Sequence, residues 1–130
     1  MKKIVLITAL IALVGLAWGQ SNMGPWILIG DQNNVKIYRS YSTCNGDLAV
    51  MLRVENSNSI PVAVSFNSAF NLSGSILPIN LPKQYVVAAK ETIGGDCSAG
   101  DMKINPNNYV TTIQIGVSDY IIQNLKIVQL

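Results

Sequence analysis

The chain has 130 residues, of which 49% are hydrophobic and 12% charged, and its formal net charge is +2 at neutral pH. That length suffices for one domain with a single core. The basic residues are scattered along the chain, so we do not expect nucleic acid as a partner. Histidine is absent from the sequence, which removes the commonest general base and the commonest zinc ligand.

Residues 1–19 have the pattern of a secretory signal peptide. Two lysines precede an uncharged apolar run, 4–17, and a small-x-small pattern places cleavage after Gly19. The run is shorter than the roughly 20 residues of a membrane span. We therefore favour a cleaved signal peptide, and an uncleaved N-terminal anchor is the alternative. We expect a single processed domain, 20–130, that is close to neutral, secreted or periplasmic, and without stable membrane insertion.

Short apolar runs rich in β-branched residues follow, separated by Asn, Gly, Asp, Ser and Pro. Two runs alternate clearly, one with Leu48, Val50, Leu52 and Val54 on its inward face and one with Ile60, Val62, Val64 and Phe66. Such period-two alternation is typical of strands with one buried face. The runs that we expect to be strands are 26–30, 35–41, 47–56, 60–70, 75–81, 84–91, 108–118 and 120–130.

The predicted class is all-β, because no stretch shows a convincing helical stripe. The strand spacing favours an immunoglobulin-like (Ig-like) two-sheet sandwich of about seven to eight strands after the signal peptide. A small β-barrel is the alternative. The polar stretch 55–61 separates two alternating runs, and we expect it to be a hairpin turn between core strands, with Pro61 at a strand start or edge. Its Asn and Ser residues are more typical of turns than of a recognition loop.

Cys44 and Cys97 are the only cysteines. Export to an oxidising compartment predicts a disulfide between them, since a redox pair would need close spacing or a basic neighbour. We expect the bridge to clamp two loops at one end of the domain, with Cys44 ahead of its strand. Trp26 is expected to cover an edge of the core, and the alternative for it is a ligand platform.

The same bridge predicts that Asp47, Asp96 and Asp101 come close together. Calcium accepts carboxylate and carbonyl oxygens from Gly-containing loops of this kind, so the three residues form a candidate calcium site. The alternative is ordinary turn chemistry, because Asn-Gly-Asp and Gly-Gly-Asp favour turns. We expect no other metal or cofactor.

A resemblance to known proteins involves Cys44, the stretch 48–66 (LAVMLRVENSNSIPVAVSF) and the stretch 88–97 (AAKETIGGDC). Their order resembles small exported Ig-like β-sandwich proteins of Bacteroidota-type bacteria. Those proteins carry no assigned activity, so the resemblance implies a fold and a compartment but no mechanism. The segment 41–50 (YSTCNGDLAV) is also similar to periplasmic lysozyme inhibitors, which are small disulfide-bearing β-barrels, although their Ser-Gly-Ala loop motif is absent.

The function that we expect is binding without catalysis. The carboxylates of the processed chain show no signature spacing, so we expect no enzymatic activity, with a small glycosidase as the alternative. The favoured hypothesis is a secreted or periplasmic binding, adhesion or accessory module with an unidentified protein or glycan ligand. One alternative is an inhibitor of a secreted hydrolase, either a lysozyme or a protease. Another is a self-assembling structural or surface subunit, because the apolar run 125–130 could pair through a strand edge.

Overall fold

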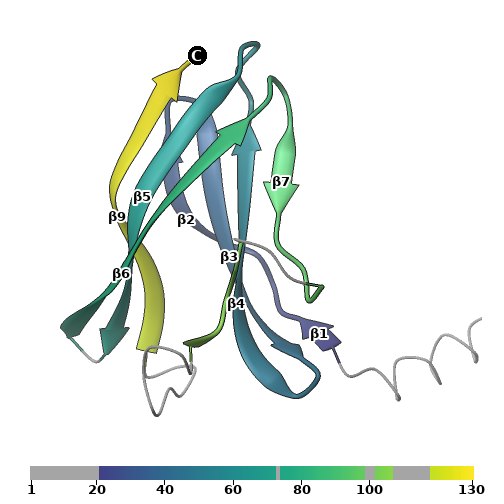
Figure 1. Cartoon of the computed structure of the whole chain (residues 1–130), viewed down its shortest axis with the longest axis vertical. Coiled ribbons are helices and arrows are strands. Elements are labelled where there is room, and N and C mark those ends of the chain that lie inside the picture. The colour runs from purple at the N-terminus through teal and green to yellow at the C-terminus, as the bar shows by residue number, and fades with distance from the viewer. Residues whose placement is uncertain (1–20, 73, 99–101, 107–117) are drawn as a thin grey trace, which may run out of the picture.

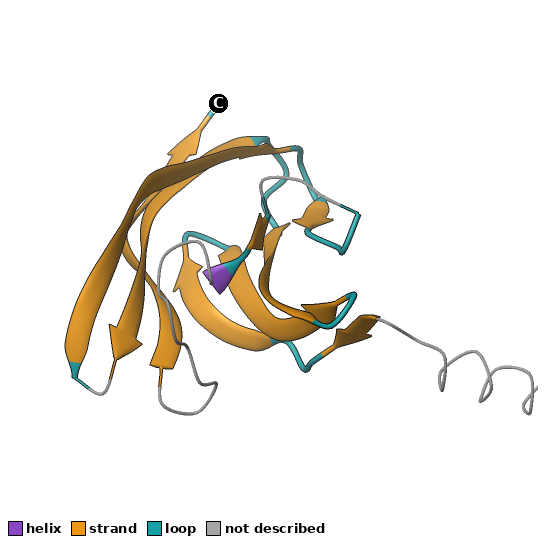
Figure 2. Ribbon diagram, turned by 60° about the horizontal axis from the view of Figure 1, so that its bottom comes forward, coloured by secondary structure: helices purple, strands orange, loops and turns teal. Residues whose placement is uncertain are grey.

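Two antiparallel β-sheets face each other across a hydrophobic core in the computed structural model of the chain (Figure 1). The structure describes residues 21–72, 74–98, 102–106 and 118–130. In this part of the chain strands dominate the regular structure (Figure 2), and the two sheets do not close into a barrel. None of its helical segments is long and apolar enough to cross a membrane. The prediction of an all-β sandwich is confirmed.

Sheet A, the larger sheet, contains β1 Ser21–Met23, β2 Ile27–Gln32, β3 Val35–Cys44, β4 Asp47–Asn56, β7 Thr92–Gly94 and β8 Lys103–Ile104. Its centre is the long hairpin of β3 and β4, which pair from Val35 opposite Asn56 to Cys44 opposite Asp47. The shorter strands extend the sheet on both sides, with β1 and β2 beside β3, and β7 and β8 beside β4.

Sheet B contains β5 Val62–Leu72 in the centre, with β6 Ser75–Val87 and β9 Ser118–Gln129 on either side. The register of both pairs shifts near Phe66. On β9 the shift lies at Asn124, whose φ of 56° is consistent with a bulge. The extra residue moves the inward-facing positions of β9 from even numbers, as at Tyr120, to odd numbers, as at Ile127.

Two tight turns explain why β2, β3 and β4 follow one another as neighbours. Asn33 and Asn34 connect β2 to β3, and Asn45 and Gly46 connect β3 to β4. All four residues have positive φ, at 50°, 60°, 55° and 85° in chain order, as two-residue type I′ hairpin turns require. These Asn residues therefore serve the backbone of the turns.

The core between the sheets is made of the inward-facing side chains of alternating residues. Val50, Leu52 and Val54 of β4 are buried in one cluster with Val62 and Val64 of β5, as the alternation predicts. Two residues of the predicted inward sets are not fully buried: Leu48 is half-buried, and Ile60 is 36% exposed. Ile60 precedes β5 and therefore lacks the neighbours that a strand residue has in the sheet.

The polar stretch 55–61 is not a hairpin, contrary to the prediction. β4 belongs to sheet A and β5 belongs to sheet B, so the stretch carries the chain from one sheet to the other. A hairpin and a crossing between sheets would give the same alternation in the flanking strands, because each strand has one buried face in either case. Pro61 comes directly before the first residue of β5, at the strand start, as expected.

Asn56 holds this crossing in place from inside the molecule. Its side chain is buried, and its amide nitrogen lies 3.0, 3.3 and 3.0 Å from the carbonyl oxygens of Ile60, Val87 and Ala88. Its amide oxygen accepts hydrogen bonds from the backbone N–H and the side-chain amide of Asn58, both at 2.9 Å. The end of β4, the crossing and the end of β6 are thereby joined through one side chain.

Other predicted boundaries also change. The runs 75–81 and 84–91 merge into the single strand β6, which as an edge strand tolerates Pro82. The short strands β1, β7 and β8 were not predicted. The predicted strand 108–118 lies almost wholly outside the described residues, and the predicted signal peptide, 1–19, lies entirely outside them.

Candidate functional site

The predicted disulfide between Cys44 and Cys97 is present, with an S–S distance of 2.04 Å. Cys44 is the last residue of β3, so the prediction that it precedes its strand is wrong. The bridge therefore ties a strand end of sheet A to the loop after β7. It packs with buried Ala49 and Met51, which point to the side of β4 opposite the main core. We call these four residues the disulfide cluster.

Trp26 packs against the disulfide cluster. The guanidinium group of Arg53 lies over its indole ring, 4.2 Å from the ring centroid. Such a cation–π contact occupies a ring face that a ligand would otherwise use. Trp26 thus covers a small outer core on sheet A, separate from the core between the sheets.

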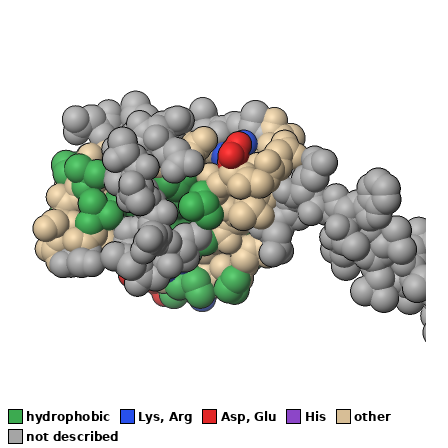
Figure 3. Space-filling view, turned by 90° about the horizontal axis from the view of Figure 1, so that it is seen from below, with side chains coloured by type: hydrophobic (Ala, Val, Ile, Leu, Met, Phe, Trp, Pro, Cys, Tyr) green, Lys and Arg blue, Asp and Glu red, His purple; other side chains and the backbone are tan. Residues whose placement is uncertain are grey.

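The bridge brings the segments of Asp47 and Asp96 to one end of the molecule. Asp47 lies opposite Cys44 across the β3–β4 turn, and Asp96 lies next to the bridge in the chain. The third predicted ligand, Asp101, lies outside the described residues. Seen from this end, the described surface shows few charged side chains (Figure 3).

Local bonds occupy the carboxylate of Asp96. One oxygen accepts a hydrogen bond from the Ser98 hydroxyl and another, at 2.8 Å, from the Ser98 backbone N–H. These two bonds hold the pKa of Asp96 below its ordinary value. They are the turn chemistry that the alternative interpretation expected. Within the described ranges no three candidate metal ligands form a group, and the calcium site stays a prediction.

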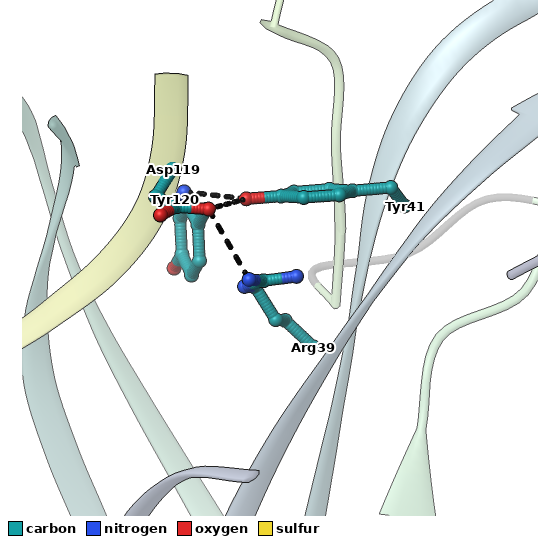
Figure 4. A network of polar contacts seen from close by, with 4 residues as sticks. All are labelled: Arg39, Tyr41, Asp119 and Tyr120. Carbon is teal, nitrogen blue, oxygen red and sulfur yellow. Dashed lines mark hydrogen bonds and ion pairs between the residues drawn. The ribbon is translucent and has the colours of Figure 1, made fainter. Parts of the chain in front are cut away.

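A polar network joins the two sheets at a place that the sequence did not single out (Figure 4). The Asp119 carboxylate of β9 accepts hydrogen bonds from the Tyr41 hydroxyl at 3.0 Å and from the Arg39 guanidinium at 3.2 Å, both on β3. That guanidinium also lies over the Tyr41 ring, at 4.1 Å from its centroid. The Tyr41 oxygen accepts the backbone N–H of Tyr120 at 2.9 Å, and the Tyr120 and Ser68 hydroxyls bond to each other.

The network continues the inward face of β3. Arg39 and Tyr41 occupy the alternate positions that follow Val35 and Ile37, so this face changes from apolar to polar toward the disulfide end. A period-two count along 35–41 would have found them. Burial raises the pKa of the Tyr41 phenol above its ordinary value, and the bond from the Tyr120 N–H and the charge of Arg39 partly oppose that shift.

The bonds of the network are internal to the fold. Its one carboxylate, on Asp119, pairs with the Arg39 guanidinium, whose side chain is 13% exposed. The Nε atom of Arg39 is buried and has no hydrogen-bond partner in the described part of the chain. Through these bonds the network attaches β9 to sheet A.

The outer faces of the two sheets differ. On sheet A, Ser40 and Met51 are buried beneath other segments: the Ser40 hydroxyl donates to the Gly24 carbonyl at 2.7 Å, and Trp26 packs over the disulfide cluster. On sheet B the outward-facing side chains are half-buried or exposed, except for Ala69 of β5, which is buried. We call twelve of them the open face: Ala63, Ser65, Asn67, Asn71, Ile76, Pro78, Gln84, Val86, Ile121, Gln123, Lys126 and Val128.

The open face combines aliphatic and amide side chains. Val86 on β6 and Val128 on β9 are 63% and 43% exposed and lie opposite Ala63 of the central strand, which makes an apolar row across the sheet. Lys126 is its one charged member, and it has no aromatic member. Its chemistry is therefore that of a nearly neutral, weakly apolar surface.

Comparison with known proteins identifies no relative of this chain. No family model matches it, and neither a curated protein nor a solved structure does. The function has to be inferred from the residues and their geometry.

Proposed function

We propose that the protein is an exported, non-enzymatic binding module of the Ig-like type. It holds another protein on the open face of sheet B and acts in adhesion or as a surface or accessory protein. The Cys44–Cys97 bridge supports export, because disulfides persist in oxidising compartments. The pattern of residues 1–19 supports the same secreted or periplasmic location.

The observation that carries the proposal is the unequal covering of the two sheets. Around Ser40 and Met51 the outer face of sheet A is covered by the segment of Gly24 and Trp26 and by the bridged loop, and Leu28 of β2 is exposed beside this cover. The outer face of sheet B has the exposed row of Val86, Ala63 and Val128 instead. Exposed apolar side chains bordered by polar ones mark interaction surfaces.

The chemistry of the open face favours a protein ligand. Aliphatic side chains beside amides can bury apolar area and still satisfy backbone groups of a partner through hydrogen bonds. The open face has no aromatic ring, which would offer a sugar an apolar stacking surface. With Lys126 as its one charge, it has little attraction for a polyanion.

The test compares two matched variants on opposite sheets. Val86→Lys places a charge on the open face, and Leu28→Lys makes the same change on β2 of sheet A at a similar exposure of 47%. The purified protein and both variants are immobilised, and partners from the producing culture are captured and identified by mass spectrometry. We expect a partner that binds the wild type and Leu28→Lys, and that binds Val86→Lys at least ~10-fold more weakly.

Equal binding by the two variants would refute a role for the open face. Binding to a glycan array that Val86→Lys abolishes would replace the protein ligand by a sugar. Slowing of a lysozyme or a protease in a hydrolase panel by the wild type would support the inhibitor alternative instead.

A further inference from the structure

The two edges of sheet B differ in how far they can accept another strand. β6 contains Pro78 and Pro82, which have no N–H to donate. Prolines on an edge strand prevent pairing with another chain. β9 contains no proline from Ser118 to Gln129.

Sheet A covers the first half of the outer edge of β9. The Tyr41 hydroxyl accepts the Tyr120 N–H at 2.9 Å. Gly30 of β2 lies so close to Ile122 that a Cβ there would be 2.9 Å from the Ile122 Cδ1 atom. This cover extends through the bulge at Asn124 to Leu125, whose Cδ2 atom would lie 3.4 Å from the same Cβ. Beyond the bulge, no described strand pairs with the outer edge of β9.

The hydrogen-bond alternation shows which groups face that edge. In an antiparallel pair, successive residues point their N–H and C=O groups alternately toward and away from the partner. The Leu130 N–H donates to the Pro61 carbonyl at 3.0 Å, on the β5 side. The backbone N–H and C=O groups therefore point toward β5 at Leu130, Val128 and Lys126. They point away from β5, toward the outer edge, at Ile127 and Gln129. The outward N–H of Tyr120 agrees with the same alternation before the bulge.

We propose that a second copy of this chain pairs antiparallel with β9 about a two-fold axis at Val128. Residues that face each other across an antiparallel pair share one face of the sheet, so the axis must pass through a residue rather than between two. About Val128, Ile127 lies opposite Gln129 of the second copy, and Gln129 opposite its Ile127. Each of these two pairs can exchange both backbone hydrogen bonds.

The side chains fit this register. Val128 meets Val128 of the second copy, so the apolar row that begins at Val86 and Ala63 continues into the partner without interruption. Lys126 lies opposite Leu130 of the partner, so the two lysines do not face each other. An axis at Ile127 would instead require pairing by Leu125, which follows the bulge and packs close to Gly30.

A second copy is the occupant because the edge is complementary to itself in this register. The same patch serves on both molecules, as in an isologous dimer. The prolines of β6 protect the opposite edge of sheet B, so pairing stops at two copies rather than growing into a fibre. The dimer leaves Val86 outside the contact between copies, and it therefore does not depend on the proposed ligand.

The test places a proline on either edge of sheet B. Gln129→Pro removes an N–H from the outer edge of β9, and Gln84→Pro removes the equivalent N–H from the outer edge of β6; both glutamines are exposed. Sedimentation velocity over a concentration series measures association, and circular dichroism checks the fold. We expect the wild type and Gln84→Pro to dimerise, and Gln129→Pro to weaken dimerisation at least ~10-fold.

A crosslinking pair tests the register without disturbing the backbone. The native cysteines are bonded to each other, so Val128→Cys adds one free thiol per chain. Residues in a non-hydrogen-bonded antiparallel pair have Cα atoms about 4.5 Å apart, which a disulfide can span. We expect mild oxidation to give a covalent dimer with Val128→Cys and a monomer with Val86→Cys.

A wild type that stays monomeric at millimolar concentration would overturn the proposal. So would a dimer that Gln129→Pro leaves intact, or equal crosslinking of the two cysteine variants. Capture of a protein ligand by a monomer would leave the proposed function standing while this inference fails.

Discussion

Asn56→Asp tests whether the crossing between the sheets depends on a buried amide donor. At neutral pH the introduced carboxylate keeps the shape of the amide but has no N–H. It would face the carbonyl oxygens of Ile60 and Ala88, which now lie 3.0 Å from the amide nitrogen. A buried carbonyl left without its donor costs ~1–3 kcal/mol, so two of them predict a loss of ~2–6 kcal/mol, before any penalty for the buried charge.

The penalty should depend on pH. Burial and the facing carbonyl oxygens favour the neutral form of the introduced carboxyl, so its pKa in the folded state should exceed the unfolded value of about 3.9. The folded state then binds the proton more tightly, so the loss is smallest below the unfolded pKa and grows as pH rises through the folded pKa. Asn56→Ala adds no titrating group, and its penalty should not change with pH.

The assay is urea unfolding followed by far-UV circular dichroism, at neutral pH and at about pH 4. Asn67→Asp, the same change at an exposed position on β5, is the control, and it should alter the free energy of unfolding by no more than ~0.5 kcal/mol. A loss below ~1 kcal/mol for Asn56→Asp at neutral pH would refute the reasoning. Equal losses for this variant at the two pH values would refute its electrostatic part.

Two further predictions concern a glycine contact and the polar network. Gly95→Ala should lower the free energy of unfolding by ~2 kcal/mol or more, because its Cβ would lie 2.4 Å from the Met102 carbonyl oxygen. Gly30→Ala, whose Cβ meets the flexible end of a side chain, should cost less than ~1 kcal/mol; equal urea midpoints would contradict this. Tyr41→Phe should cost ~1–2 kcal/mol, because it leaves the Tyr120 N–H without its acceptor. Since burial raises the pKa of the Tyr41 phenol above 10.0, the wild type should lose stability as pH rises through that folded pKa, and an identical alkaline profile in Tyr41→Phe would contradict the burial of this phenol.

Local patterns predict the strands well where one face is buried. The alternation over 47–56 coincides with β4, and the pairs at 33–34 and 45–46 form the turns that their residues favour. The disulfide also follows from composition, since Cys44 and Cys97 are the only two cysteines. The strands and turns depend on residues that are neighbours in the chain, and two cysteines allow only one pairing.

Local patterns fail where the partner is distant. The hairpin expected at 55–61 is a crossing between sheets, although the alternation on both sides is correct. Local patterns do not predict the polar network either, because Arg39 and Asp119 are 80 residues apart. Neither residue stands out among the scattered charges of the chain.

The sequence by itself determined the all-β class, the bridge, and most strands of this protein, because alternation and turn conformation are decided within a few residues. Only the tertiary structure decided which strands share a sheet. Asn56 can bind the end of β6 only once both sheets have formed, and Tyr41 can reach Tyr120 only across the space between them. The covering of sheet A and the open face of sheet B are likewise properties of pairing over long distances, which period-two alternation does not encode.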